Sequence, residues 1–154
     1  MSVMSLRREL EQRGLEYELI PHKRTLSAVA EAKVVGVTPE EVGKTVVLRT
    51  DEGYVRAALA ASDRLDLHKV REALPERHDV RVASESELAA AYPMFELGAV
   101  PPWGGPAGDR VLVDSRLAGR ESVVVEAGAH DESLRLRTAD LLAVTGADVA
   151  DLAE

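Results

Sequence analysis

The stretch from Gly98 to Asp109 restricts the fold more than any other part of the chain. It contains three of the seven prolines, four of the eleven glycines and the only Trp, so neither a helix nor a ladder-forming strand can run through it. Glycines let a backbone approach a ligand closely, and prolines fix its path, which together favour a shaped backbone cradle. A surface connection or an interdomain linker is the alternative. Only about 45 residues follow, fewer than usually form an independent core, so we interpret the stretch as a loop within one domain and as a candidate site.

Length and composition predict one ordinary globular domain spanning residues 1–154. Hydrophobic residues make up 45% and charged residues 30% of the chain, and its apolar runs fall far short of the roughly 20 residues that cross a bilayer. Residues 1–8 lack the apolar core of a secretory signal. We therefore expect a cytoplasmic protein with no membrane partner. The absence of cysteine excludes disulfides, thiolate metal sites and cysteine nucleophiles.

The net charge of −8 limits the nucleic acids that the chain can bind. It argues against avid binding along a nucleic-acid backbone, so we expect no DNA partner, whereas contact with one end of an RNA is compatible with it. Local positive charge occurs in the first third, at His22-Lys23-Arg24, Lys33 and Lys44. Three Tyr, one Phe and one Trp are too few for a broad platform that stacks single-stranded bases.

Hydrophobic periodicity predicts an intermixed order of helices and strands. Helical spacing predicts helices over residues 4–13, 26–34, 62–74, 84–91, 138–144 and 148–152, with a further short one starting at 39. Alternating and β-branched runs predict strands at 17–20, 45–50, 54–61, 80–83, 110–114, 122–126 and 133–137, with a hairpin turn at 51–53. Hairpins outnumber strand-helix-strand units, so we expect an α/β (α+β) domain with a mixed, mainly antiparallel sheet surrounded by helices.

Two helix starts carry capping signals. Ser84 and Glu87 predict a capping box. Thr25 is expected to cap the helix over 26–34, whose inward face would be formed by apolar residues at helical spacing, namely Leu26, Val29, Ala30 and Val34.

The usual signatures of metal and cofactor sites are missing from the sequence. The four histidines are His22, His68, His78 and His130. None pairs at the i, i+3 or i+4 spacing that places two ligands on one helix face, and we interpret His68 and His78 as surface residues. The chain contains no G-x-S-x-G elbow, no G-x-G-x-x-G and no complete phosphate loop. We therefore expect no metal and no cofactor.

Lys44 is a candidate ligand for a phosphate. It follows the short helix and precedes the strand over 45–50, so it could instead complement a helix dipole. As a compact, rotatable point charge it could equally anchor a substrate phosphate, opposite a loop whose N–H groups face a reactive carbonyl.

The order of segments carries a family resemblance. In chain order these segments are Val42-Gly43-Lys44-Thr45-Val46-Val47-Leu48, the hairpin partner from Ala57 to Leu67, the Gly98-x-x-x-Pro102 loop, Val111–Asp114 and Leu136–Leu142. From about Tyr17 to its end, the chain resembles the YbaK/EbsC-type aminoacyl-tRNA deacylases. That family includes free-standing proteins and the editing insertion domain of bacterial prolyl-tRNA synthetases. The resemblance implies a barrel-like form of the expected sheet.

The resemblance also implies the functional residues. Lys44 would hold the phosphate near the terminal adenosine, and Gly98 would begin the backbone that positions the aminoacyl carbonyl, so these two are the expected catalytic residues. His22 and Thr25 would line the entrance, as a His and a Thr do in similar sequences. The other expected substrate-binding residues are Thr45, Ala99, Val100, Pro101, Pro102, Gly128 and His130.

An aminoacyl ester is already activated, so a positioned water, backbone donors to the oxyanion and the ribose hydroxyl of the substrate could suffice for hydrolysis. The resemblance suggests this substrate-assisted route. We expect a free-standing deacylase that acts at the acceptor end of aminoacyl-tRNA and removes a small mischarged amino acid, with Ala favoured over Cys or Ser. An aminoacyl-tRNA synthetase is a second candidate partner. The alternatives are a non-catalytic module that binds aminoacyl-tRNA or a synthetase, and a small-molecule hydrolase that uses the same pocket.

Overall fold

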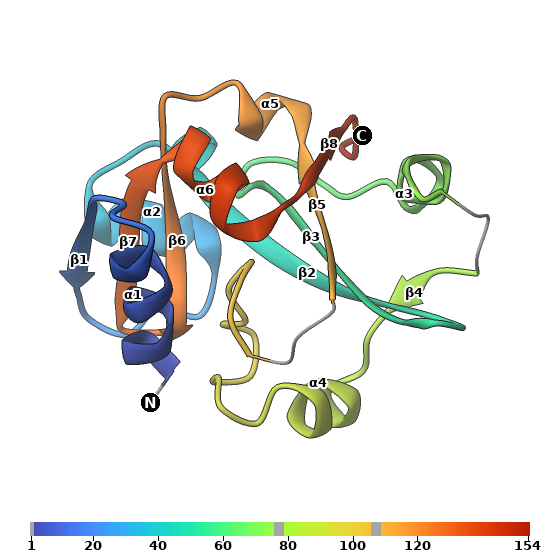
Figure 1. Cartoon of the computed structure of the whole chain (residues 1–154), viewed down its shortest axis with the longest axis horizontal. Helices are drawn as coiled ribbons and strands as arrows, with labels where there is room; N and C mark the ends of the chain where they lie inside the picture. The colour runs from blue at the N-terminus through green and yellow to red at the C-terminus, as the bar shows by residue number, and fades with distance from the viewer. Residues whose placement is uncertain (1, 76–78, 106–108) are drawn as a thin grey trace.

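One sheet of eight strands organises the fold (Figure 1). The structure, a computed structural model, describes residues 2–75, 79–105 and 109–154. Its strands are β1 (Tyr17–Pro21), β2 (Val42–Thr50), β3 (Gly53–Ala60), β4 (Arg81–Val82), β5 (Arg110–Asp114), β6 (Ser122–Ala129), β7 (Glu132–Arg137) and β8 (Asp148–Ala150). Its helices are α1 (Ser2–Gln12), α2 (Ala28–Val35), α3 (Leu67–Ala73), α4 (Glu85–Ala91), α5 (Ser115–Ala118) and α6 (Thr138–Thr145), with the 3-10 helix η1 (Pro39–Glu41).

The sheet is mixed. Its strands follow the order β1-β7-β6-β2-β3-β5-β8, and β4 pairs with β2 outside this path. The pairs β6–β2, β3–β5 and β5–β8 are parallel, whereas β1–β7, β2–β3, β2–β4 and β6–β7 are antiparallel. The expected mixed α/β domain with a mainly antiparallel sheet is confirmed. The strand order ends at β1 and β8, and within the described ranges no pairing joins these two strands.

The hairpin of β2 and β3 lies at the centre of the sheet and is the longest pairing. Its register runs from Gly43 opposite Ala60 to Thr50 opposite Gly53, as the Asp51-Glu52-Gly53 turn predicts. Gly43 also pairs with Val125 of β6. A Cβ at Gly43 would lie 3.1–3.3 Å from side-chain atoms of Leu117, Val123 and Val125. The close approach of β2 to β6 therefore favours glycine at this position, next to Lys44.

Helices cover the sheet and bury two main apolar clusters. Figure 1 shows α1 and α6 beside β6 and β7, where fully buried Leu6 and Leu10 of α1 pack with Leu134 and Leu141. A second cluster joins α3 to the hairpin and to β5. The predicted capping box is confirmed at the start of α4, where the Ser84 side chain accepts from the Glu87 main chain and the Glu87 carboxylate accepts from Ser84 N–H.

The first difference from the expectations concerns α2. Its N-cap is Ser27, whose hydroxyl accepts from Ala30 N–H at 3.1 Å, so the prediction of Thr25 as the cap was wrong. The predicted apolar face was also wrong, because Leu26 is 79% exposed while Glu31 and Ala32 are buried. Glu31 faces inward because the Ser133 hydroxyl of β7 donates to its carboxyl group at 2.6 Å.

Two further segments differ. The helix predicted over 62–74 begins only at Leu67, where the Asp66 carboxylate caps it by accepting from His68 and Lys69 N–H. The tail helix predicted over 148–152 is strand β8, which pairs in parallel with β5. His78 and residues 106–108 of the Gly/Pro loop lie outside the described residues. Among the helices of the described ranges, none combines the length and the apolar composition needed to cross a bilayer.

Candidate functional site

A cavity of about 220 Å³ brings Lys44 and Gly98 together. It lies between the start of α2, strands β2 and β6, and the loop that follows α4. Its lining residues are Leu26, Ser27, Ala28, Gly43, Lys44, Thr45, Val46, Gly98, Val100 and Glu126.

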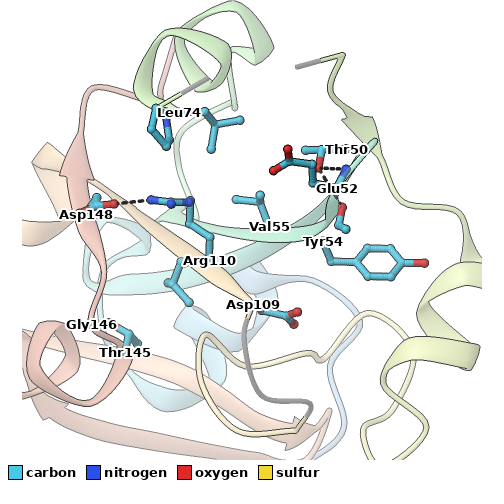
Figure 2. Close-up of a pocket in the computed structure, with 13 residues that line it drawn as sticks. Thr50, Glu52, Tyr54, Val55, Leu74, Asp109, Arg110, Thr145, Gly146 and Asp148 are labelled. Atoms are coloured by element: carbon cyan, nitrogen blue, oxygen red, sulfur yellow. Dashed lines mark hydrogen bonds and ion pairs between the residues drawn. The ribbon is translucent and has the colours of Figure 1, made fainter. Parts of the chain in front are cut away.

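A larger cavity of about 550 Å³ lies at the far end of the β2–β3 hairpin (Figure 2). None of the residues predicted to be functional lines it. Its wall contains an ion pair between Arg110 and Asp148, with 2.9 Å between Nη1 and Oδ2. Because the predicted residues meet in the smaller cavity, that cavity is the candidate active site.

Lys44 is the third residue of β2 and reaches the cavity from a strand rather than from a helix end. Its ammonium donates to the carbonyl oxygens of Ala61 at 3.3 Å and Asp63 at 2.5 Å, both in the segment after β3. Burial lowers its pKa, and the nearby Asp63 carboxylate opposes that shift. These contacts do not support the helix-dipole interpretation. Among the described residues two acceptors hold the ammonium, so its third hydrogen is available for a ligand.

The loop from Gly98 to Pro102 has a defined backbone shape. Gly98 has a φ of +83°, a left-handed conformation that glycine adopts without a steric penalty. A Cβ at this residue would also lie 3.5 Å from Cε1 of His130. Gly98 lies within a turn that is closed by a hydrogen bond from Ala99 N–H to the carbonyl of Glu96 at 3.0 Å. The left-handed backbone therefore favours glycine at the edge of the cavity, and the His130 ring packs beneath this residue at van der Waals distance.

A buried arginine holds the far side of this loop. Arg56 of β3 is 2% exposed and donates to the carbonyl of Pro101 at 2.9 Å and to that of Gly104 at 2.5 Å. Its guanidinium also lies 3.3 Å from the Asp109 carboxylate and 4.9 Å from the centre of the Tyr92 ring. One planar group thus fixes both carbonyls of the Gly/Pro loop, in keeping with the fork-like donor geometry of arginine.

Glu126 and His130 form a paired acid and imidazole at the cavity. Nδ1 of His130 lies 3.0 Å from Oε2 of Glu126, and Nε2 lies 2.7 Å from the carbonyl oxygen of Leu97. A carbonyl can only accept, so Nε2 carries a hydrogen and Nδ1 shares a proton with Glu126. Burial, and to a smaller extent the Glu96 carboxylate, raises the pKa of Glu126 to about 8. The group can therefore gain or lose a proton near neutral pH.

The comparisons with known proteins identify the family of the chain. Residues 21–144 match the family model described as the aminoacyl-tRNA editing domain. The chain belongs to the aminoacyl-tRNA editing domain family. It is therefore an aminoacyl-tRNA hydrolase, its substrate is an aminoacyl-tRNA, and the predicted relationship to the YbaK-type deacylases is confirmed. No curated protein matches the sequence.

Solved structures show that the fold of this editing domain recurs over its whole length. One is described as the "crystal structure of a putative trans-editing enzyme for prolyl tRNA synthetase"; it is 29% identical, with a TM-score of 0.85 over 99% of this chain and 97% of that chain. A second, the crystal structure of a hypothetical protein, is 26% identical, with a TM-score of 0.88 over 97% of this chain and 99% of that chain.

The editing domain gathers some of the predicted residues around the cavity and leaves others outside its lining. Lys44, Thr45, Gly98 and Val100 line it, and His130 packs beneath Gly98. Ala99, Pro101 and Pro102 shape the loop but lie outside the cavity lining. The same is true of His22, Thr25 and Gly128, which lie around the 130–133 turn. The His22 ring lies 2.8 Å from Ser133 Oγ. Thr25 N–H donates to the carbonyl of His130 at 3.0 Å, and the carbonyl of Gly128 accepts from Glu96 N–H at 2.8 Å.

Sequence reasoning missed two side chains that shape the candidate site, Glu126 and Arg56. Glu126 ends a β-branched run of β6 and has a histidine four residues later, a signal that could have drawn attention to it. Neighbouring Glu31 was also missed. It is fully buried, its second oxygen Oε1 has no hydrogen-bond partner among the described residues, and burial raises its pKa to about 8.

Proposed function

We propose that this editing domain removes a small mischarged amino acid from tRNA, with alanine favoured over cysteine and serine, and that it acts in trans. The single observation that supports this proposal is the meeting of Lys44 and Gly98 in one cavity of about 220 Å³. A cavity of this size limits the side chain that it admits. Excluding larger, correct amino acids is easier than selecting among small ones, because one methylene is worth only about 1–3 kcal/mol.

In the proposed reaction, Lys44 holds the phosphate near the terminal adenosine through its available N–H. The loop that begins at Gly98 positions the ester carbonyl and its developing oxyanion. The oxygen of a water molecule attacks the carbonyl carbon, oriented by the neighbouring ribose hydroxyl of the substrate. The bond between the carbonyl carbon and the ribose oxygen breaks, the ribose oxygen takes up a proton, and free amino acid and tRNA are released. Positioning supplies most of the acceleration.

A deacylation assay with tRNAs carrying alanine, cysteine, serine or proline tests the proposal. We expect the wild-type protein to hydrolyse the small esters, alanine fastest. Lys44→Ala should lower kcat/KM by about 10- to 100-fold, because one charge-assisted hydrogen bond is worth about 1.5–3 kcal/mol. A wild-type protein that is inert on all four esters, or a Lys44→Ala variant with full activity, would rule the proposal out.

Lys69→Ala is a matched control for this experiment. Lys69 also donates to a main-chain carbonyl, that of Ala153 at 2.6 Å, and it pairs with Asp151 outside the cavity lining. Its removal should leave deacylation within about twofold of wild type. Repeating the assay with and without prolyl-tRNA synthetase tests the proposed synthetase partner, which should increase turnover if it delivers the substrate.

A further inference from the structure

The candidate cavity contains one basic and one acidic side chain on neighbouring strands. Lys44 and Glu126 both line it, each directly after the last registered pair of the parallel strands, Gly43 with Val125. Lys44 donates to the carbonyls of Ala61 and Asp63, whereas Glu126 faces His130. Separate partners thus hold the basic and the acidic group in the wall of one cavity.

Glu126 is fixed in orientation but keeps one oxygen for a ligand. Three hydrogen bonds fix His130. Its main-chain N–H donates to the Glu96 carboxylate at 2.6 Å, its Nε2 donates to the Leu97 carbonyl, and its Nδ1 bonds to Oε2 of Glu126. The Glu126 side chain is 14% exposed. Within the described ranges, the hydrogen bond of this carboxyl group is made by Oε2, and the other oxygen, Oε1, accepts none. A carboxyl group held by His130 on one oxygen therefore lines the cavity and has its other oxygen available for a ligand.

Aminoacyl-tRNA carries two charges near the scissile ester, a phosphate and the α-ammonium group of the amino acid. The ammonium nitrogen is bonded to the carbon next to the ester carbonyl, so it must lie close to wherever that carbonyl binds. The Gly98 loop is separated from Glu126 by one imidazole ring, with 3.5 Å from the Gly98 Cβ position to Cε1 of His130 and 3.0 Å from Nδ1 to Glu126. This arrangement matches a substrate with its phosphate at Lys44 and its carbonyl at Gly98.

We infer that Glu126 binds the α-ammonium group of the esterified amino acid and that His130 holds the carboxyl group in place for it. This inference rests on the proposed function. The high pKa of Glu126 is consistent with it, because a cation beside the carboxyl group would offset the unfavourable effects of burial and of Glu96. The editing domain would then recognise the amino acid by the group that all aminoacyl esters share, and the cavity volume would select its side chain.

Two esters that differ only in the ammonium group test the inference. Alanyl-tRNA carries the ammonium, and lactyl-tRNA carries a hydroxyl in its place. On alanyl-tRNA, Glu126→Gln should lower kcat/KM by about 10- to 100-fold, mainly through KM, because a charge-assisted hydrogen bond is lost. On lactyl-tRNA the same variant should change kcat/KM by less than about threefold. An equal loss on both esters would overturn the inference and leave Glu126 as a residue that only positions His130.

Glu96→Gln is the matched control, because Glu96 also contacts His130 but lies outside the cavity lining. Removal of its charge favours the ionised form of Glu126, so Glu96→Gln should not lower kcat/KM more on alanyl-tRNA than on lactyl-tRNA. If Glu126→Gln does not fold, the wild-type protein still decides the question through inhibition by adenosine 5′-phosphate carrying a 3′-alanylamido or a 3′-lactylamido group. The alanyl compound should bind at least about tenfold more tightly, and equal affinities would refute the inference. A wild-type protein that hydrolyses neither ester would instead refute the proposed function itself.

Discussion

At the scale of single residues, Arg56 connects the core to the shape of the site. Its guanidinium holds the carbonyls of Pro101 and Gly104 in fixed positions, so the backbone that begins at Gly98 is shaped before a substrate arrives. Arg56→Lys keeps the charge but cannot reach both carbonyls and Asp109 together. We expect it to lower the free energy of unfolding by about 2–4 kcal/mol, as breaking a buried charge network does. Urea denaturation measures this loss, and deacylation by the folded variant should fall as well.

Arg49→Lys provides the comparison for Arg56→Lys. Arg49 lies 4.8 Å from the centre of the Tyr54 ring, much as Arg56 lies 4.9 Å from that of Tyr92, but its side chain is 38% exposed. We expect Arg49→Lys to change the free energy of unfolding by less than about 1 kcal/mol. Similar losses of unfolding free energy in both variants would show that stacking on the aromatic ring, and not the hydrogen bonds of the buried guanidinium, accounts for the effect of Arg56→Lys.

Sequence could predict Lys44 and Gly98 because local composition and family order identify them. It could not predict the contact of Arg56 with the loop, since the loop acceptors of that side chain are the main-chain carbonyls of Pro101 and Gly104, which any residue type supplies. The pairing of Glu126 with His130 was hidden for a different reason. In a regular strand, residues four apart are separated by about 13 Å. Only the irregularity in the β6–β7 register between Glu126 and Ala129 brings the two side chains together.

At the scale of elements, α2 shows why hydrophobic spacing can identify the wrong face. Glutamate is rarely buried without a partner, and the partner of Glu31 is Ser133, in a strand distant in the sequence. The apolar residues Leu26 and Val29 are consequently exposed, and Leu26 lines the candidate cavity. The strand β8 was missed for a related reason, because a three-residue strand is defined by its neighbour β5 and not by its own pattern.

A pair of serine substitutions tests this orientation of α2. Ala32 is buried and Val29 is 52% exposed. Ala32→Ser would place a hydroxyl in the core and should lower the free energy of unfolding by about 1–3 kcal/mol. Val29→Ser should change it by less than about 0.5 kcal/mol. Thermal denaturation of the two variants ranks them, and the opposite order would mean that the helix packs through its apolar face.

At the scale of the whole molecule, the sequence predicts the order of the elements better than their arrangement. The hairpin β2–β3 was predictable because its strands are adjacent and share a turn. The parallel pairs β6–β2 and β3–β5 join strands that are far apart in the sequence, and periodicity carries no information about such partners. These pairs place Lys44 beside β6 and thus beside Glu126. The charge pattern of the cavity is therefore a property of the topology.

A fully buried carboxyl group, Glu31, and a half-buried one, Glu126, make the stability of the whole domain dependent on pH. Burial raises the pKa of Glu31 and of Glu126 to about 8, above the value of about 4.3 expected in the unfolded chain. The folded state thus binds these protons more tightly, so their stabilising contribution is complete below about pH 4 and is lost as the pH rises through 8. We expect the free energy of unfolding to decrease between pH 5 and pH 8, by at most about 1.4 kcal/mol per pH unit for each carboxyl group.

Substitutions at Glu31 and Ser133 separate this effect from other titrations. Glu31→Gln keeps an oxygen that can accept from the Ser133 hydroxyl but has no proton to lose, so the decline in stability from pH 5 to pH 8 should become shallower. Ser133→Ala removes the hydrogen bond that lowers the pKa of Glu31, so in this variant the decline should extend to higher pH. Urea denaturation at each pH measures both slopes. If Glu31→Gln declines as steeply as wild type, Glu31 is already ionised in the folded protein and makes no contribution to the pH dependence of stability.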